Sequence, residues 1–308
     1  MAGRHFLSII LLLAIFMTCS SAPEQRNEVS EKKNRAAEYT EFGNAHFSQA
    51  NYSQALNFFN LALNDNISVD NEEGIVQSYN SIGKVYMALQ ELSLAENNFS
   101  QGLNLAYKIG NPLFISRSAN NLGEVYLFRN QLDRSLGLLQ EARAQIVSEN
   151  PGADGAIIYH NVGSVYKKMG QLDRALKFFH DALEINLELK RFEEAASNYY
   201  MISSIYSKKG DYAGALEHAG QALRLDKLVE NSLGIAKDLL ALGIIHNKSG
   251  RHDEAYENFK KSYQVYQTMN LTREIRKILP FLITAAELNG KSAEADQYRA
   301  ILKEIEGK

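Results

Sequence analysis

Cysteine is almost absent from this chain, because its 308 residues include only one, Cys19. A single cysteine excludes an internal disulfide and a metal site built from paired cysteines. The sequence also lacks a glycine-rich phosphate-binding loop and a histidine pair at metal-ligand spacing. We therefore expect no enzymatic activity, no cofactor and no metal ion.

An excess of basic residues is missing as well. The chain has 33 lysine and arginine residues against 36 aspartate and glutamate residues, a formal net charge of −3. A nucleic-acid-binding surface needs an excess of positive charge, so no nucleic-acid partner is expected. No stretch of alternating apolar and polar residues indicates a β-strand, and the predicted fold class is all-α.

A repeat of constant length runs through the chain. It is marked by a small residue, which we call the reference position of each copy. A tyrosine or histidine follows the reference position by three residues, and a small residue follows it by twelve. This spacing predicts helix pairs that approach closely at the reference residue and bury their faces by stacking on the next pair. The reference positions, forty apart in each case, are Gly43, Gly83, Gly123, Gly163, Ser203 and Gly243.

The best-preserved copies, at residues 79–103 and 159–183, resemble the tetratricopeptide repeat family. The resemblance implies a right-handed superhelical solenoid over residues 36–308, with six helix pairs and a degenerate seventh near residue 283. The usual period of the family is about 34 residues. The longer period found here is similar to the variant in LGN-type adaptors, kinesin light chains and Rap-type regulators.

The degenerate seventh copy has Ile283 at its reference position and Pro280 within its first helix. Proline in a helix interior is expected to interrupt or kink it. Terminal repeats are normally atypical and cap the stack, so we expect the last helix to present a polar outer face. Its polar residues are Lys291, Glu294, Asp296, Arg299 and Lys303.

Residues 1–18 have the pattern of a secretory signal peptide. Arg4 precedes an apolar run that extends from Phe6 to Met17. A membrane-spanning helix needs about 20 residues. The run is shorter than that, so it fits the apolar part of a signal peptide better than an anchor.

The position of Cys19, close behind this run, resembles a bacterial lipoprotein processing site. The resemblance implies that Cys19 is lipidated and that residues 19–35 form a flexible tether. It also implies a periplasmic location, with Ser20 favouring the outer membrane over the inner one. Cleavage after residues 20–22 with soluble export, or an uncleaved anchor, are the alternatives.

The resemblance also implies where a protein or peptide partner binds. In this family the first helix of each pair lines a concave groove. Asparagine there offers two donors and an acceptor to a peptide backbone, although it can instead bridge adjacent helices. The apolar Leu240 and Ile244 take the groove positions of the sixth copy. The implied groove residues are Asn44, Asn80, Lys84, Asn120, Asn121, Glu124, His160, Asn161, Ser164, Tyr200 and Ser204.

Lysines follow the reference positions of the fourth to sixth copies by four to six residues. They predict a basic edge that could attract an acidic partner. Alternatively, these cations only complement the dipoles at the ends of the first helices. The basic edge comprises Lys167, Lys168, Lys208, Lys209 and Lys248.

These patterns together predict a non-enzymatic scaffold or adaptor. It would be a lipoprotein of the bacterial envelope that binds a peptide segment or partner in its groove. Its membrane contact would be through the N-terminal lipid alone. The alternative is a peptide-sensing regulator that changes its superhelical pitch when ligand binds.

Overall fold

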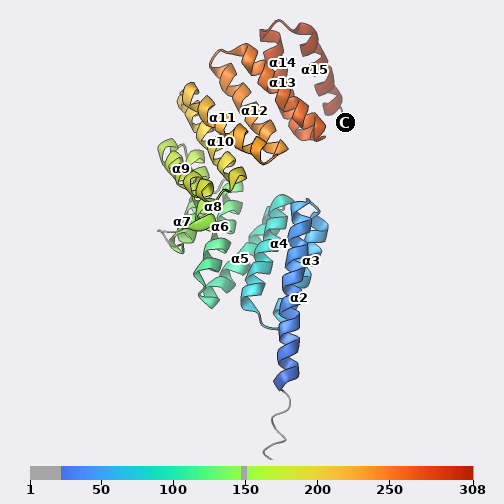
Figure 1. Cartoon of the computed structure of the whole chain (residues 1–308), viewed down its shortest axis with the longest axis vertical. Helices are drawn as coiled ribbons and strands as arrows, with labels where there is room; N and C mark the ends of the chain where they lie inside the picture. The colour runs from blue at the N-terminus through green and yellow to red at the C-terminus, as the bar shows by residue number, and fades with distance from the viewer. Residues whose placement is uncertain (1–21, 147–150, 308) are drawn as a thin grey trace, which may run out of the picture. The chain divides into compact units, whose positions relative to one another are not determined.

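The computed structural model describes residues 22–146 and 151–307, with side chains from residue 27 onward. Within these ranges there are fourteen α-helices and no strand (Figure 1). The all-α prediction is therefore confirmed. The chain divides after Gln145 into two compact units, each of which is a stack of helix pairs.

The first unit holds three pairs and the second holds four, which matches the predicted six pairs and a terminal seventh. Within each unit, every helix packs against the next one along the chain. The pairs of the first unit are α2 (Ala22–Ser48) with α3 (Tyr52–Ser68), α4 (Glu72–Ala88) with α5 (Leu92–Ile109), and α6 (Pro112–Phe128) with α7 (Leu132–Ala144). Those of the second are α8 (Gly152–Lys168) with α9 (Leu172–Glu188), α10 (Phe192–Lys209) with α11 (Tyr212–Leu228), α12 (Ser232–Lys248) with α13 (His252–Thr268), and α14 (Thr272–Leu288) with α15 (Ser292–Glu306).

The turns that join the helices share one backbone conformation. A residue in the left-handed region recurs at a constant interval, from Ala50 to Asn130 in the first unit and from Gly170 to Gly290 in the second. In all of these turns except the one at Gly110, the amide after it donates to the carbonyl five residues earlier, as from Asn51 to His46 at 2.9 Å. This hydrogen bond closes the last helical turn. Because the interval is half the length of the repeat, each repeat consists of two helix-and-turn halves of equal length.

The reference positions lie where the two helices of a pair touch. A Cβ atom added to Gly83 would lie 2.4 Å from the ring of Phe99, so the helices can approach this closely only without a side chain. Ser203 is the exception. The residue sixteen positions later is Ala219 instead of phenylalanine, and the Ser203 hydroxyl donates to the carbonyl of Ala215 at 2.7 Å. A larger reference residue is thus matched by a smaller partner, as close packing requires.

Helix α2 begins at Ala22, so residues 22–35 are helical, whereas the sequence pattern favoured a flexible tether. This segment contains no glycine and is rich in glutamate, lysine and arginine, which favour helix. Lys32 lies 3.0 Å from Glu28, one turn earlier. Pro23 occurs in the first turn, where its missing N–H removes no helical hydrogen bond. Residues 1–18 and Cys19 lie outside the described residues.

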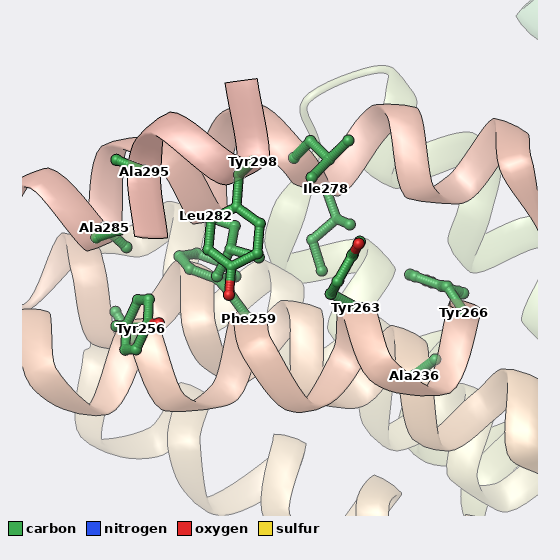
Figure 2. Packing of buried hydrophobic residues seen from close by; sticks show 13 residues of the cluster. Ala236, Tyr256, Phe259, Tyr263, Tyr266, Ile278, Leu282, Ala285, Ala295 and Tyr298 are labelled. Atoms are coloured by element: carbon green, nitrogen blue, oxygen red, sulfur yellow. The ribbon is translucent and has the colours of Figure 1, made fainter. Parts of the chain in front are cut away.

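The last pair closes the apolar core of the second unit. Helix α14 is unbroken across Pro280, so the expected interruption is not observed. Pro280 is on the exposed face, where solvent can satisfy the carbonyl that loses its helical donor. On the opposite face, Ile278 and Leu282 pack with Tyr263 of α13 and Tyr298 of α15 (Figure 2).

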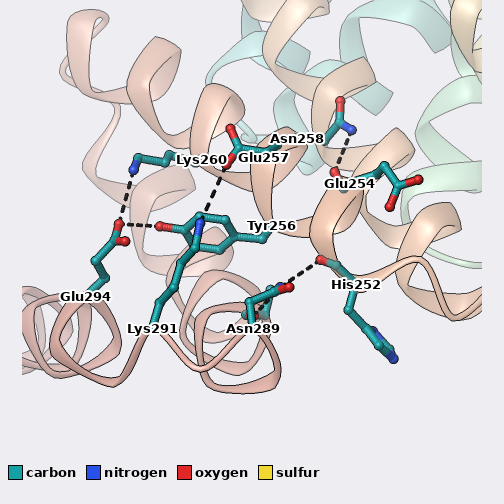
Figure 3. A network of polar contacts seen from close by, with 10 residues as sticks. His252, Glu254, Tyr256, Glu257, Asn258, Lys260, Asn289, Lys291 and Glu294 are labelled. Atoms are coloured by element: carbon teal, nitrogen blue, oxygen red, sulfur yellow. Dashed lines mark hydrogen bonds and ion pairs between the residues drawn. The ribbon is translucent and has the colours of Figure 1, made fainter.

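Two of the polar residues expected on the outer face, Lys291 and Glu294, are half-buried and contact α13. The Lys291 ammonium lies 3.9 Å from the centroid of the Tyr256 ring and 3.7 Å from Glu257. Glu294 accepts hydrogen bonds from the Tyr256 hydroxyl and, at 3.1 Å, from Lys260 (Figure 3). These contacts fasten the terminal pair to α13. The exposed residues of α15 include Asp296, Arg299 and Lys303.

Candidate functional site

Two predicted groove asparagines of the first unit, Asn80 and Asn121, lie between the first helices of neighbouring pairs, α4 and α6. The Asn80 amide donates to the Ser118 hydroxyl at 2.8 Å, and the Asn121 amide donates to Oδ1 of Asn80 at 3.0 Å. Asn80, Asn120 and Asn121 are all buried. The amides of Asn80 and Asn121 therefore join α4 to α6, the alternative that the sequence left open. Their contact with a peptide stays a prediction.

Charged residues complete the predicted groove positions of the first unit. Lys84 on α4 and Glu124 on α6 occupy the same position of consecutive repeats. Burial raises the pKa of Glu124, and the positive charge of Lys84 acts in the opposite direction. Asn44 and Lys84 are exposed, and Glu124 is half-buried. These predicted groove positions are thus polar, and Asn44 and Lys84 are open to solvent.

His160 lines a pocket of about 210 Å³ between α8 and α10 of the second unit. Its Nδ1 lies 3.2 Å from Nδ2 of Asn198, whose Oδ1 accepts from Asn186 at 3.0 Å. Burial, and then the charge of Lys167, lower the pKa of His160 to about 4. The imidazole is therefore neutral near pH 7 and can accept the asparagine hydrogen bond. Asn161 lies in the same pocket.

A second pocket, of about 320 Å³, lies between α10 and α12. Tyr200, a predicted groove residue, lines it together with Asp226 and Asp238. Both aspartates are buried, with 5% and 2% of their surface exposed. Burial, and then the neighbouring charge of Asp226, raise the pKa of Asp238 to about 8.

This aspartate pair was not predicted from the sequence. A signal was available, because the corresponding positions of other repeats carry neutral residues, such as Asn66 and Ser78. Recognising it required knowing that these positions face each other across two consecutive helix pairs, which the repeat spacing alone does not show.

The remaining groove positions of the second unit are half-buried. Ser164 and Ser204 follow the reference residues of α8 and α10 and retain partial exposure. Leu240 and Ile244 of α12 pack against the apolar cluster of α13 and α14. These two α12 positions therefore take part in the apolar packing of the second unit, and their place in a binding groove stays a prediction.

The basic edge is only partly available for an acidic partner. Lys209 forms an ion pair with Asp173 at 2.7 Å. Burial, and then repulsion by Lys208, lower the pKa of Lys167 to about 8. Lys168, Lys208 and Lys248 are exposed. The dipole alternative and a role in binding both stay predictions.

Metal clusters and membrane-spanning helices are absent from the part of the chain that the structure describes. Over residues 22–146 and 151–307, no group of three or more histidine, cysteine, aspartate or glutamate side chains is arranged to hold a metal ion. Among the helices of these ranges, none combines the length and apolar character needed to cross a membrane.

Comparison with known families identifies the repeat. A family model described as "Tetratricopeptide repeat" matches residues 114–188, 155–228 and 193–268. Counted without overlap, these matches cover about half of the chain. No curated protein matched the sequence.

Solved structures with a similar fold cover most of the chain. A Rap protein complexed with competence and sporulation factor is 19% identical, with a TM-score of 0.65, over 87% of this chain and 74% of its own. The Rap conjugation gene regulator of plasmid pLS20, in complex with the Phr* peptide, is 19% identical, with a TM-score of 0.64, over 86% and 70%. The Pseudomonas aeruginosa pilF protein is 17% identical, with a TM-score of 0.56, over 77% and 94%. At these identities the likeness concerns the fold.

Proposed function

Because the chain belongs to the tetratricopeptide repeat family, we propose that it is a non-catalytic scaffold that holds a protein or peptide segment along its first helices. The observation that carries this proposal is a pair of adjoining pockets in the second unit. One lies between α8 and α10 and the other between α10 and α12, and the exposed Ser197 lines both. Together they offer polar groups and apolar surface to one extended segment.

A peptide is the partner that the structural neighbours favour. The two Rap proteins were solved with competence and sporulation factor and with the Phr* peptide. The same likeness favours the second candidate, a sensor that changes its pitch around a peptide. Small-angle X-ray scattering separates the two, because a sensor compacts when its peptide is added and a rigid scaffold keeps its radius of gyration.

The scaffold proposal is tested at Ile157, which lines the first pocket and is 39% exposed. Full-length protein would be crosslinked in envelope extract and its partners identified by mass spectrometry. Ile157→Arg should lose the specific partner because it places a long cation in the pocket.

The control for this experiment is Leu187→Arg, on α9, where the replaced side chain is 38% exposed. It adds the same charge outside both pockets and should retain the partner. Equal capture by both variants would contradict binding along the first helices.

We also propose that the protein is an exported lipoprotein, tethered to the periplasmic side of a membrane through Cys19. The pattern of residues 1–18 and the position of Cys19 support this proposal. Cys19→Ser should leave the precursor unprocessed or the protein detached from membranes, as read from its size and from fractionation. Normal processing together with retention on the membrane would refute the lipid anchor.

A further inference from the structure

The pocket between α10 and α12 holds more hydrogen-bond acceptors than donors. Asp226, near the end of α11, takes a hydrogen bond at Oδ1 from the Asn231 amide at 3.0 Å. Oδ2 of Asp238 is buried, and no described residue donates a hydrogen bond to it. A buried acceptor without a donor is costly, and more so when it carries charge.

The charges around this acceptor are also unbalanced. Glu193 lines the pocket together with Asp226 and Asp238, so the lining contains three acidic residues. Against these three acids stands one basic residue, Lys237, whose side chain is exposed. Tyr200 contributes a half-buried aromatic ring. The lining therefore favours a positively charged guest with several N–H donors.

Other repeats show that the fold does not need this acid pair. The same two positions carry neutral residues in every other repeat that the structure describes. These pairs are Asn66 with Ser78, Ala106 with Ser118, Ile146 with Ile158, Asn186 with Asn198, and Tyr266 with Ile278.

The repeat containing Asn66 matches the acidic site most closely. Asn71 donates to Asn66 at 2.7 Å, as Asn231 donates to Asp226. Gly74 packs against Asn66 as Gly234 packs against Asp226, because a Cβ atom on either glycine would clash with that side chain. The fold therefore accepts an amide where this pocket has a carboxylate. The negative charge of the pocket is thus not required for folding, and we look for its reason in binding.

We propose that the pocket between α10 and α12 binds the guanidinium group of an arginine side chain carried by the peptide partner. A planar guanidinium presents five donors and pairs with carboxylates through two parallel hydrogen bonds. It also stacks on aromatic rings such as that of Tyr200. The inference rests on the proposed function, since it names the kind of peptide that the first helices would select.

Without a peptide, the protonation of the pocket depends on the same two aspartates, Asp226 and Asp238. Two carboxyl groups held close together do not both ionise readily, so they share a proton. An arginine supplies the positive charge that this proton supplied, and the proton leaves to solvent. Binding should therefore release a proton and become tighter as pH rises through the range in which the pair titrates.

The probes for this pocket are N-acetyl-arginine amide and N-acetyl-citrulline amide, titrated calorimetrically into the full chain. Citrulline keeps the shape and length of arginine but carries no charge. We expect the arginine probe to bind about tenfold or more tightly than the citrulline probe, since hydrogen bonds to charged groups contribute about 1.5–3 kcal/mol. Equal affinities, or no binding of the arginine probe, would overturn the inference.

Two variants locate the binding. Asp238→Asn should remove the preference for arginine and still fold, because Asn198 occupies the same position in the preceding repeat. Asp253→Asn, on the exposed surface of α13, removes the same charge elsewhere and should keep the preference. Circular dichroism would check the fold of both. A preference that survives Asp238→Asn contradicts this site.

The crosslinking experiment distinguishes this inference from the proposed function. A partner lost with Ile157→Arg but captured normally by Asp238→Asn would overturn the arginine site and leave the scaffold intact. A partner unaffected by either variant would overturn both.

Discussion

At the scale of single residues, the repeat depends on a match between the reference residue and the residue sixteen positions later. Glycine faces a phenylalanine ring in four copies and a leucine in one, whereas Ser203 faces Ala219. The space between the paired helices stays filled in each case. A reference residue is therefore selected together with its partner and cannot be changed alone.

Gly83→Leu tests this match. An added Cβ atom would already lie 2.4 Å from the Phe99 ring, so we expect the free energy of unfolding to fall by about 1–3 kcal/mol or more. The measurement is urea denaturation. Gly137→Leu is the control, because Gly137 lies within helix α7 and an added Cβ would have no atom within 4 Å apart from its chain neighbours and its own helix backbone.

The control should be stabilised by up to about 1 kcal/mol, the usual gain when glycine leaves a helix interior. A second comparison uses Gly83→Ser with Phe99→Ala, which copies Ser203 and Ala219. The double variant should lose less stability than the sum of the single ones. Full additivity would show that the two residues do not share the constraint.

The buried aspartates make a prediction about pH. Because the folded protein holds a proton on the pair at a pH where the unfolded chain has lost it, stability should decline as pH rises from about 4 to about 8. The slope is at most about 1.4 kcal/mol per pH unit for one proton. Thermal unfolding across this range should show a shallower decline in Asp238→Asn. Identical pH profiles would mean that Asp238 does not hold the proton.

At the scale of helices and turns, the connections are more uniform than their residues. Alanine, aspartate, glutamine, asparagine, lysine and glutamate adopt the left-handed conformation in seven turns, where glycine does so in others. The hydrogen bond that closes most of these turns and the packing of the following helix favour this geometry. Non-glycine residues there carry a strain of about 1 kcal/mol.

Lys190→Gly should relieve this strain. Lys190 has a φ of 55° and an exposed side chain, so the substitution removes little else. We expect a gain of about 1 kcal/mol in the free energy of unfolding, measured by chemical denaturation. The reverse change, Gly210→Ala at a φ of 82°, should cost a similar amount. A loss of stability in Lys190→Gly would place the cause of the turn in the lysine side chain.

At the scale of the whole molecule, the chain forms two compact units of stacked helix pairs. The second unit ends in the pair α14 and α15, which packs against α13. This pair is held by both apolar and polar contacts. Tyr298 packs edge-on against Tyr263 with ring centroids 5.7 Å apart, and Glu294 bonds to Tyr256 and Lys260. The terminal pair therefore covers a face of α13 that would otherwise expose aromatic rings to water.

The fold was predictable because its information is local and repeated. Gly83, Tyr86, Ala95 and Phe99 lie at helical spacing, and their counterparts recur in the other copies of the repeat. The contacts of the predicted groove residues were less predictable, because a position on a helix does not reveal what faces it. Asn80 has the expected position, but its amide is bonded to a neighbouring helix.

Short-range periodicity in the amino-acid sequence is enough to define the helical class, the number of pairs and the residues at which paired helices touch. Which polar groups bond to one another, and which remain without a donor, depends on how the helices pack in space. Asp226 and Asp238 lie on different helices, and only the packing of α11 against α12 brings them into one pocket. Burial and the proximity of like charges, which set their chemistry, are properties of that packing.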